Sequence, residues 1–114
     1  MSPNDVVNGL WTVEFLSTFN RAGKGVLVFT NGRLLGGDAG YYYSGTYTVT
    51  GNRIEGKVNV KRYDINSISI FGNMESFAIS FAGEINNYSL STVGEILDKP
   101  QYKIRLIGNK RENI

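Results

Sequence analysis

The 114-residue chain contains no cysteine and no histidine, and it has only 2 prolines. Without cysteine, no disulfide framework can stabilise the fold, and the sequence implies no particular redox compartment. The absence of both residues also excludes the usual zinc sites, thiol nucleophiles and imidazole-based catalytic triads. Only carboxylates, hydroxyls, lysine and tyrosine remain as candidate catalytic groups.

Long apolar runs and a strong charge of one sign are also missing. The apolar runs are far too short to span a bilayer, and the first seven residues lack the charged start and long apolar stretch of a secretory signal. The formal net charge is only +2, which is more typical of a solvated surface than of a nucleic-acid footprint. We therefore expect a soluble, cytoplasmic protein that neither enters membranes nor binds nucleic acid directly.

The chain does contain a strong alternation of apolar and polar residues. Residues 11–15, 54–60, 77–85 and 102–106 place an apolar residue or glycine at every second position, which is typical of amphipathic β-strands. The 14 glycines and the many aromatic and β-branched residues agree with a composition of strands and turns. The sequence therefore predicts an all-β protein.

Turn signals divide this pattern into about eight strands. Asn31-Gly32 is the strongest hairpin signal because both positions accept positive φ, and Gly51-Asn52 and Asn86-Asn87 mark further turns. We expect strands at residues 10–17, 24–30, 33–35, 42–50, 53–61, 75–85, 88–96 and 101–107. Residues 64–74 break the alternation and predict a loop or short helical insertion over a barrel end, and the polar residues 108–114 predict a frayed tail.

No long amphipathic helix is present to cover the apolar face of such a sheet. Closing the sheet on itself buries that face and removes the exposed edges. The chain length fits one domain with one core. We therefore predict a single domain, residues 1–114 with an ordered core at about 8–108, folded as an eight-stranded antiparallel up-and-down β-barrel.

The interior of such a barrel is either filled by side chains or holds one small ligand. Inward-facing Gly56, Gly83 and Gly94 fit both cases, because glycine either relieves crowding where strands coil or leaves room for a guest. For the second case the candidate cavity-lining residues are Trp11, Phe15, Tyr47, Gly56, Phe77, Phe81 and Gly83.

The same alternation argues against catalysis. Paired catalytic carboxylates must face each other across a water-poor cavity, and the strand glutamates all fall on the outward parity, namely Glu14, Glu55, Glu84 and Glu95. Asp38 and Asp64 lie in connections, where aspartate commonly makes turns. Gly36-Gly37-Asp38 lacks the lysine and the following helix of a phosphate-binding loop. We expect no enzyme, no catalytic or metal-binding residue and no cofactor.

Some outward positions are apolar instead of polar, which favours association with a partner. The first strand neighbours both the second and the last in a closed barrel, so five such residues could form one patch: Leu10, Leu16, Val26, Val28 and Ile107. Three successive tyrosines at 41–43 cannot all point inward, so Tyr41 and Tyr42 are added as candidates for this surface. We predict a homodimer or a protein partner on this face.

Several segments in their order along the chain resemble a known family. They are residues 9–15, 25–28, 31–38, 43–47 and 58–63. The most specific element is the glycine-rich bend with Asp38, followed by the aromatic-Ser-Gly strand at 43–45. The chain is similar in these features to the negative regulators of type III secretion in enterobacteria, the pathogenicity-island repressor and its uncharacterised relatives.

This resemblance implies a lipocalin-like eight-stranded barrel that dimerises and sequesters a transcriptional activator instead of touching DNA. It also implies a hydrophobic cavity suited to a lipid-like molecule. One departure matters: the characterised repressors carry an acidic run on a hairpin that corresponds to residues 50–55. Here Asn52, Arg53 and Glu55 supply one base and one acid, so the mode of activator binding is not transferred with the resemblance.

Two functions remain open from the sequence. The first is regulation without catalysis, in which this protein binds another protein. The outer apolar patch favours this function. The alternative is a carrier that holds a small apolar ligand inside the barrel. A filled interior favours the first function, whereas an open cavity with a mouth favours the second.

Overall fold

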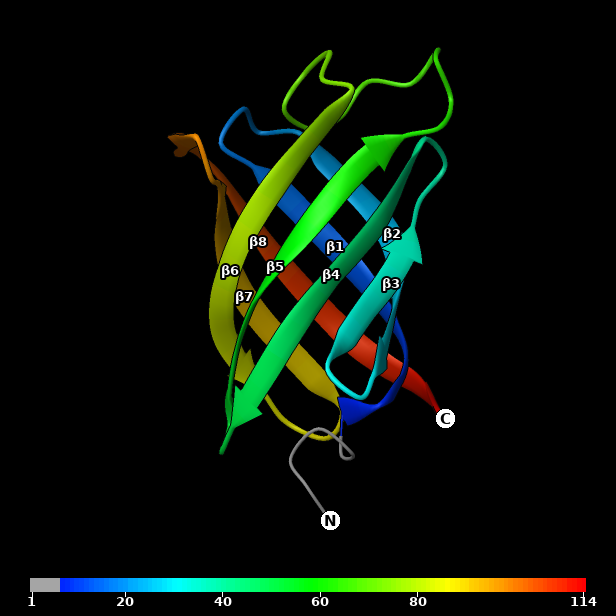
Figure 1. The fold of residues 1–114 in the computed structure, drawn as a ribbon, viewed down its shortest axis with the longest axis vertical. Coiled ribbons are helices and arrows are strands. Elements are labelled where there is room, and N and C mark those ends of the chain that lie inside the picture. The colour runs from blue at the N-terminus through cyan, green and yellow to red at the C-terminus, as the bar shows by residue number, and fades with distance from the viewer. Residues whose placement is uncertain (1–6) are drawn as a thin grey trace.

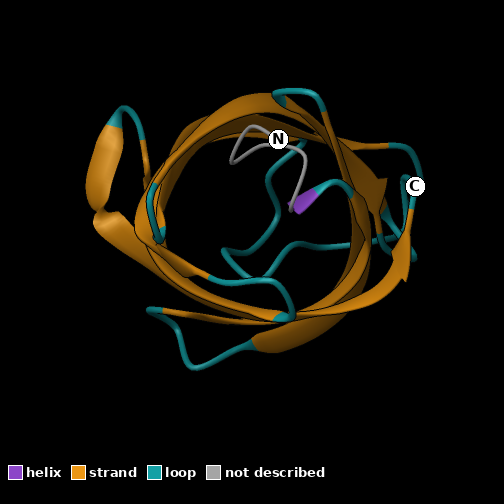
Figure 2. Cartoon of the chain, turned by 90° about the horizontal axis from the view of Figure 1, so that it is seen from below, coloured by secondary structure: helices purple, strands orange, loops and turns teal. Residues whose placement is uncertain are grey.

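A computed structural model describes residues 7–114 as one closed antiparallel barrel of eight strands in sequence order (Figure 1). The strands are β1 (Gly9–Ser17), β2 (Ala22–Thr30), β3 (Arg33–Gly37), β4 (Tyr41–Thr50), β5 (Arg53–Arg62), β6 (Ser76–Ile85), β7 (Ser89–Ile96) and β8 (Lys99–Asn113). The ring, which is seen end-on in Figure 2, closes because β1 pairs with both β2 and β8. The predicted single barrel is thus confirmed.

Aromatic side chains fill the end of the barrel where β1 begins and β2 ends, which is the lower end in Figure 1. Trp11 packs edge-on against Phe29 with ring centroids 5.7 Å apart, and Phe29 packs in the same way against Tyr47 at 4.8 Å. All three are buried, and the Trp11 indole N–H donates to the Val7 carbonyl at 2.9 Å. This cluster closes one end of the barrel and forms the floor of its interior.

The connection at the upper end is a loop, which is one of the two predicted forms, and the helical alternative is wrong. Residues 63–75 contain turns and an isolated bridge between Ser69 and Gly72, but no helical turn. Across residues 7–114 no helix has the length and apolar character to cross a membrane. The apolar residues of this connection divide into two groups: Phe71 packs onto the barrel, whereas Ile65 and Ile68 face the solvent.

The last strand is longer than the sequence indicated. β8 begins at Lys99 and continues to Asn113, so the ordered region does not end at about residue 108 and the tail is not frayed. Its second half pairs with the start of β1, with Gly9 opposite Asn113 and Trp11 opposite Lys110. The tail is polar because its exposed side chains lie outside the barrel, while the backbone ladder fixes it.

Two of the three inward glycines serve strand coiling. A Cβ atom on Gly56 would lie 2.2 Å from the Thr46 carbonyl oxygen, and one on Gly83 would lie 2.1 Å from that of Ser91. Both neighbours are backbone atoms of the adjacent strand, so they cannot move aside as a side chain can. The interpretation that these glycines relieve crowding is confirmed, and the interpretation that they leave room for a guest is wrong for both.

We expect Gly83→Ala to lower the free energy of unfolding by about 2 kcal/mol, because the added methyl group must displace the β7 backbone. Urea unfolding followed by fluorescence of Trp11, the single tryptophan, measures this loss. Ser80→Ala on the outward parity of the same strand is the matched control and should change stability by less than about 0.5 kcal/mol. If the two variants were equally stable, the close approach of the β7 backbone to Gly83 would be contradicted.

Candidate ligand-binding cavity

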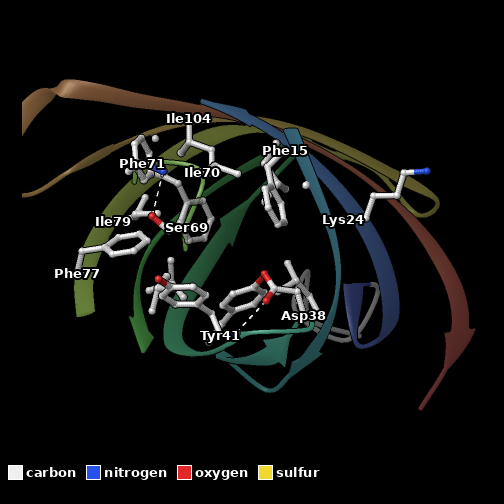
Figure 3. Close-up of a pocket in the computed structure, with 18 of the residues that line it drawn as sticks. Phe15, Lys24, Asp38, Tyr41, Ser69, Ile70, Phe71, Phe77, Ile79 and Ile104 are labelled. Carbon is white, nitrogen blue, oxygen red and sulfur yellow. Dashed lines mark hydrogen bonds between the residues drawn. The ribbon is translucent and has the colours of Figure 1, made fainter. Parts of the chain in front are cut away.

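An apolar cavity of about 310 Å³ lies inside the barrel (Figure 3). It is bounded by side chains of strands from both sides of the ring and by the connection at 63–75. The apolar lining includes Phe15, Phe71, Phe77, Ile79, Phe81 and Ile104. Its volume is at the lower end of the range of about 300 to 1,000 Å³ that is typical of ligand pockets. The barrel is therefore only partly filled by its own side chains.

The sequence placed some of these residues correctly. Phe15, Phe77 and Phe81 line the cavity as predicted, and Gly94, which is not among the predicted lining residues, lines it as well. Trp11, Tyr47, Gly56 and Gly83 do not line this cavity. The two aromatic residues instead build the floor, and the two glycines lie against neighbouring backbone.

The connection at 63–75, which we call the lid, lies across the upper end of the barrel. Its Phe71 side chain is buried and packs edge-on against Phe77 at 5.5 Å and stacked against Tyr102 at 6.2 Å. Sequence analysis assigned no cavity role to Phe71. The signal in the sequence is the group of apolar residues within 65–71, which interrupts the strand alternation.

Hydrogen bonds attach the lid to the rim of the barrel. The buried Ser17 hydroxyl donates to the Ile70 carbonyl, and the Tyr41 hydroxyl donates to that of Met74, both at 2.6 Å. Tyr41 was predicted on the outer surface, and this prediction is wrong because its side chain is only 4% exposed and points inward. The lid is thus held at both of its sides by side chains of β1 and β4.

Two arginines add contacts from outside the cavity. The Arg21 guanidinium donates to the Ser69 carbonyl at 3.5 Å. Arg62 donates to the Ser67 carbonyl at 3.3 Å and to the side-chain oxygen of Asn73 at 2.8 Å. These groups are positive charges on the upper rim, but neither arginine lines the cavity.

The barrel wall is incomplete next to the first half of β2. The ladder between β2 and β3 extends only from Thr30 to Val26, because β3 ends at Gly37 while β2 extends to Ala22. We call this interruption the side gap. Residues on both of its sides line the cavity, namely Ala22, Gly23, Lys24, Asp38, Ala39 and Gly40. Since Ala22, Lys24 and Ala39 are exposed, the cavity reaches the surface here.

Asp38 is fixed at this mouth by several hydrogen bonds. Its Oδ1 accepts from the backbone N–H groups of Gly40 and Tyr41, each at 2.9 Å, and its Oδ2 accepts from the Tyr43 hydroxyl. Burial, followed by the hydrogen bond to Asp38, raises the pKa of Tyr43 well above its ordinary value. Tyr43 therefore stays protonated and continues to donate to the carboxylate, which holds Asp38 in one position.

One buried hydroxyl on the cavity wall has no such partner. Ser17 and Ser69 are also buried, but their hydroxyls bond to lid carbonyls. Thr92 is 3% exposed and lines the cavity, and its hydroxyl makes no hydrogen bond with any of residues 7–114. A buried hydroxyl without a partner costs about 1 to 3 kcal/mol, so this site favours a bound polar atom or water.

On the outside of the barrel, the predicted apolar residues form two separate groups. Leu10 lies opposite Val28, which lies opposite Leu35, and Val26 and Tyr42 are separated only by Gly37. We call these five outward residues the outer patch: Leu10, Val26, Val28, Leu35 and Tyr42. Leu35 was missed by the sequence analysis, although it is 37% exposed.

Leu16 and Ile107 are exposed as predicted but lie apart from the outer patch. Between them and Val26 lies the ion pair of Lys24 and Glu14, with Nζ and Oε1 3.7 Å apart. Glu14 lies directly opposite Ile107 in the β1–β8 ladder. The prediction of one continuous five-residue patch is therefore wrong, since a charged pair interrupts it.

The β4–β5 hairpin lies at the lower end, away from the cavity mouth (Figure 1). Arg53 and Glu55 are exposed and 4.0 Å apart, and the Asn52 carbonyl accepts from the Ile85 N–H. The hairpin thus presents one exposed base and one exposed acid. Within residues 7–114 no cluster of acidic side chains could hold a metal ion.

Comparison with known proteins supports the fold alone. A redesigned β-barrel of solved structure superposes with a TM-score of 0.67 over 96% of this chain and 95% of its own, at 12% sequence identity. No family model and no curated protein matches the chain. The chain is thus a closed β-barrel, and the resemblance to negative regulators of type III secretion stays a prediction.

We expect Phe71→Ala to lower the free energy of unfolding by about 3 kcal/mol, since it removes a buried ring that packs on Phe77 and Tyr102. Hydrogen exchange at the lid amides of residues 69–74 should accelerate. Ile68→Ala, at a 59% exposed residue of the same lid, is the control and should change neither quantity. Unaltered lid exchange in Phe71→Ala would show that Phe71 does not anchor the lid.

Proposed function

We propose that this protein binds a small, mainly apolar ligand inside its barrel. The observation that supports the proposal is an apolar cavity that reaches the surface at the side gap. Of the two functions left open by the sequence, a cavity with a mouth favours the carrier. Shielding apolar ligand surface from water supplies the binding free energy, at about 25 cal/mol per Å².

The division of the barrel interior supports the same proposal. The buried cluster of Trp11, Phe29 and Tyr47 gives the fold a packed core that does not need the cavity to be filled. The upper half can then hold a guest without loss of the floor. At the side gap no strand ladder joins β2 to β3, so a ligand can enter the cavity there.

We expect purified protein to enhance the fluorescence of N-phenyl-1-naphthylamine, a neutral apolar probe. Val58→Phe should weaken binding at least about fivefold, because Val58 lines the cavity and the larger ring occupies its volume. Val93→Phe is the matched control, since Val93 is 59% exposed on the outer face, and it should bind as the wild type does. Equal affinity of both variants would place the probe outside the barrel.

We propose protein binding through the outer patch as a second function, with a second copy of this chain as the first occupant. Val26 and Tyr42 are 44% and 46% exposed, and they adjoin Leu35 on the same outer wall. Exposed apolar side chains gathered in this way are typical of association surfaces. The family resemblance implies a regulatory role in which the protein sequesters a transcriptional activator. In that role the protein would act as a dimer of this kind.

Sedimentation equilibrium at tens of micromolar tests this second proposal. We expect the wild type to be dimeric and Val26→Lys to be monomeric, because the substitution would bury an unpaired charge in the dimer. Val93→Lys introduces the same charge at an exposed valine outside the outer patch and should leave the dimer intact. A monomeric wild type would reject the homodimer, and equal dissociation of both variants would reject the assigned surface.

A further inference from the structure

The side gap presents a carboxylate to an apolar cavity, and we propose that Asp38 selects the head group of the ligand. The inferred ligand is an amphiphile whose polar end is a hydrogen-bond donor without negative charge, such as a long-chain alcohol or amine. Fatty-acid anions are disfavoured. This inference rests on the proposed ligand-binding function and names the class of ligand that the cavity accepts.

The two charged side chains that line the cavity among residues 7–114 are not equivalent. Figure 3 shows Asp38 directed toward the cavity and Lys24 directed away from it. The Lys24 side chain is 82% exposed and lies 3.7 Å from the Glu14 carboxylate, so water and Glu14 both weaken its field inside the barrel. The fixed charge that a bound head group meets is therefore negative.

The rim arginines do not reverse this sign. Arg21 and Arg62 donate to carbonyl groups of the lid from outside, and neither lines the cavity. Their charges attract anions toward the rim through solvent, where salt screens them. Inside the mouth, Asp38 is closer to the head group, and the low polarity of the surrounding side chains strengthens its repulsion of a carboxylate.

The hydrogen bonds of Asp38 also favour a donor. An ionised carboxylate has about four acceptor positions. Two backbone N–H groups bond to Oδ1, and the Tyr43 hydroxyl bonds to Oδ2. One acceptor position on Oδ2 is left for a ligand, and Tyr43 and the backbone hold the carboxylate so that little ordering is needed on binding. An alcohol or ammonium group can donate to this position, whereas a carboxylate anion cannot.

Displacement of N-phenyl-1-naphthylamine by dodecanol, dodecylamine and dodecanoate tests the inference with one chain length and three head groups. At a pH where dodecanoate is ionised, we expect dodecanol and dodecylamine to bind the wild type at least about tenfold more tightly than dodecanoate. Native mass spectrometry of each mixture verifies that the competitor itself is bound. This ranking needs no variant, so it decides the question even if a substitution at Asp38 unfolds the turn.

Asp38→Asn removes the charge and keeps an oxygen for the backbone N–H groups. We expect it to strengthen dodecanoate binding about tenfold and to weaken dodecylamine binding, with little effect on dodecanol. One control should keep the wild-type ranking. Glu84→Gln removes an exposed carboxylate that lies outside the barrel.

The outcomes separate the two proposals. If no amphiphile and no probe binds, the proposed ligand-binding function is wrong. If dodecanoate binds the wild type as tightly as dodecanol, or if Asp38→Asn alters the three ligands equally, the cavity binds ligands but Asp38 does not select them. The ranking described above, with its change in Asp38→Asn and not in Glu84→Gln, would support the inference.

Discussion

The pairing of β1 with β8 is the constraint on which the rest of the structure depends. It joins the two ends of the chain over the full length of β1, from Gly9 opposite Asn113 to Ser17 opposite Ile104. Without it the sheet would have two open edges and an apolar face exposed to water. With it, the alternation of side chains becomes a distinction between inside and outside, and the cavity, the lid and the outer patch all follow from that distinction.

Within the closed barrel, residue size at the inward positions decides where space remains. At the lower end the inward residues are large, and Phe29 packs edge-on against both Trp11 and Tyr47. At the upper end β2 contributes Gly23 and Gly25, which add no side chain to the interior. The Phe15 ring lies over Gly23, since a Cβ there would be 2.3 Å from Phe15 Cε2. Gly23 therefore makes room for the Phe15 ring and Gly25 for the Tyr43 hydroxyl, so the β2 glycines help to position two of the rings that line the cavity.

The strands and the closed barrel could be predicted because they depend on local alternation and on the lack of any covering helix. Phe15, Phe77 and Phe81 were recognised as lining residues from parity alone. Parity does not give the height of a residue along the barrel axis, so Trp11 and Tyr47 were assigned to the cavity although they form its floor. The side gap depends on the different lengths of β2 and β3 and on their register, which no local pattern in the sequence encodes.

The side gap and the outer patch share one wall of the barrel, which links the two proposed functions physically. Val26 and Tyr42 flank Gly37, the last residue of β3, and the chain continues directly into Asp38 at the mouth. The bend that carries Asp38 is held by hydrogen bonds to Tyr41 and Tyr43 on either side of Tyr42. A ligand that bonds to Asp38 would thereby stabilise the β4 segment that presents Tyr42 to a partner. Binding inside and association outside would then be coupled with equal effect in both directions, because a coupling free energy between two binding sites is reciprocal.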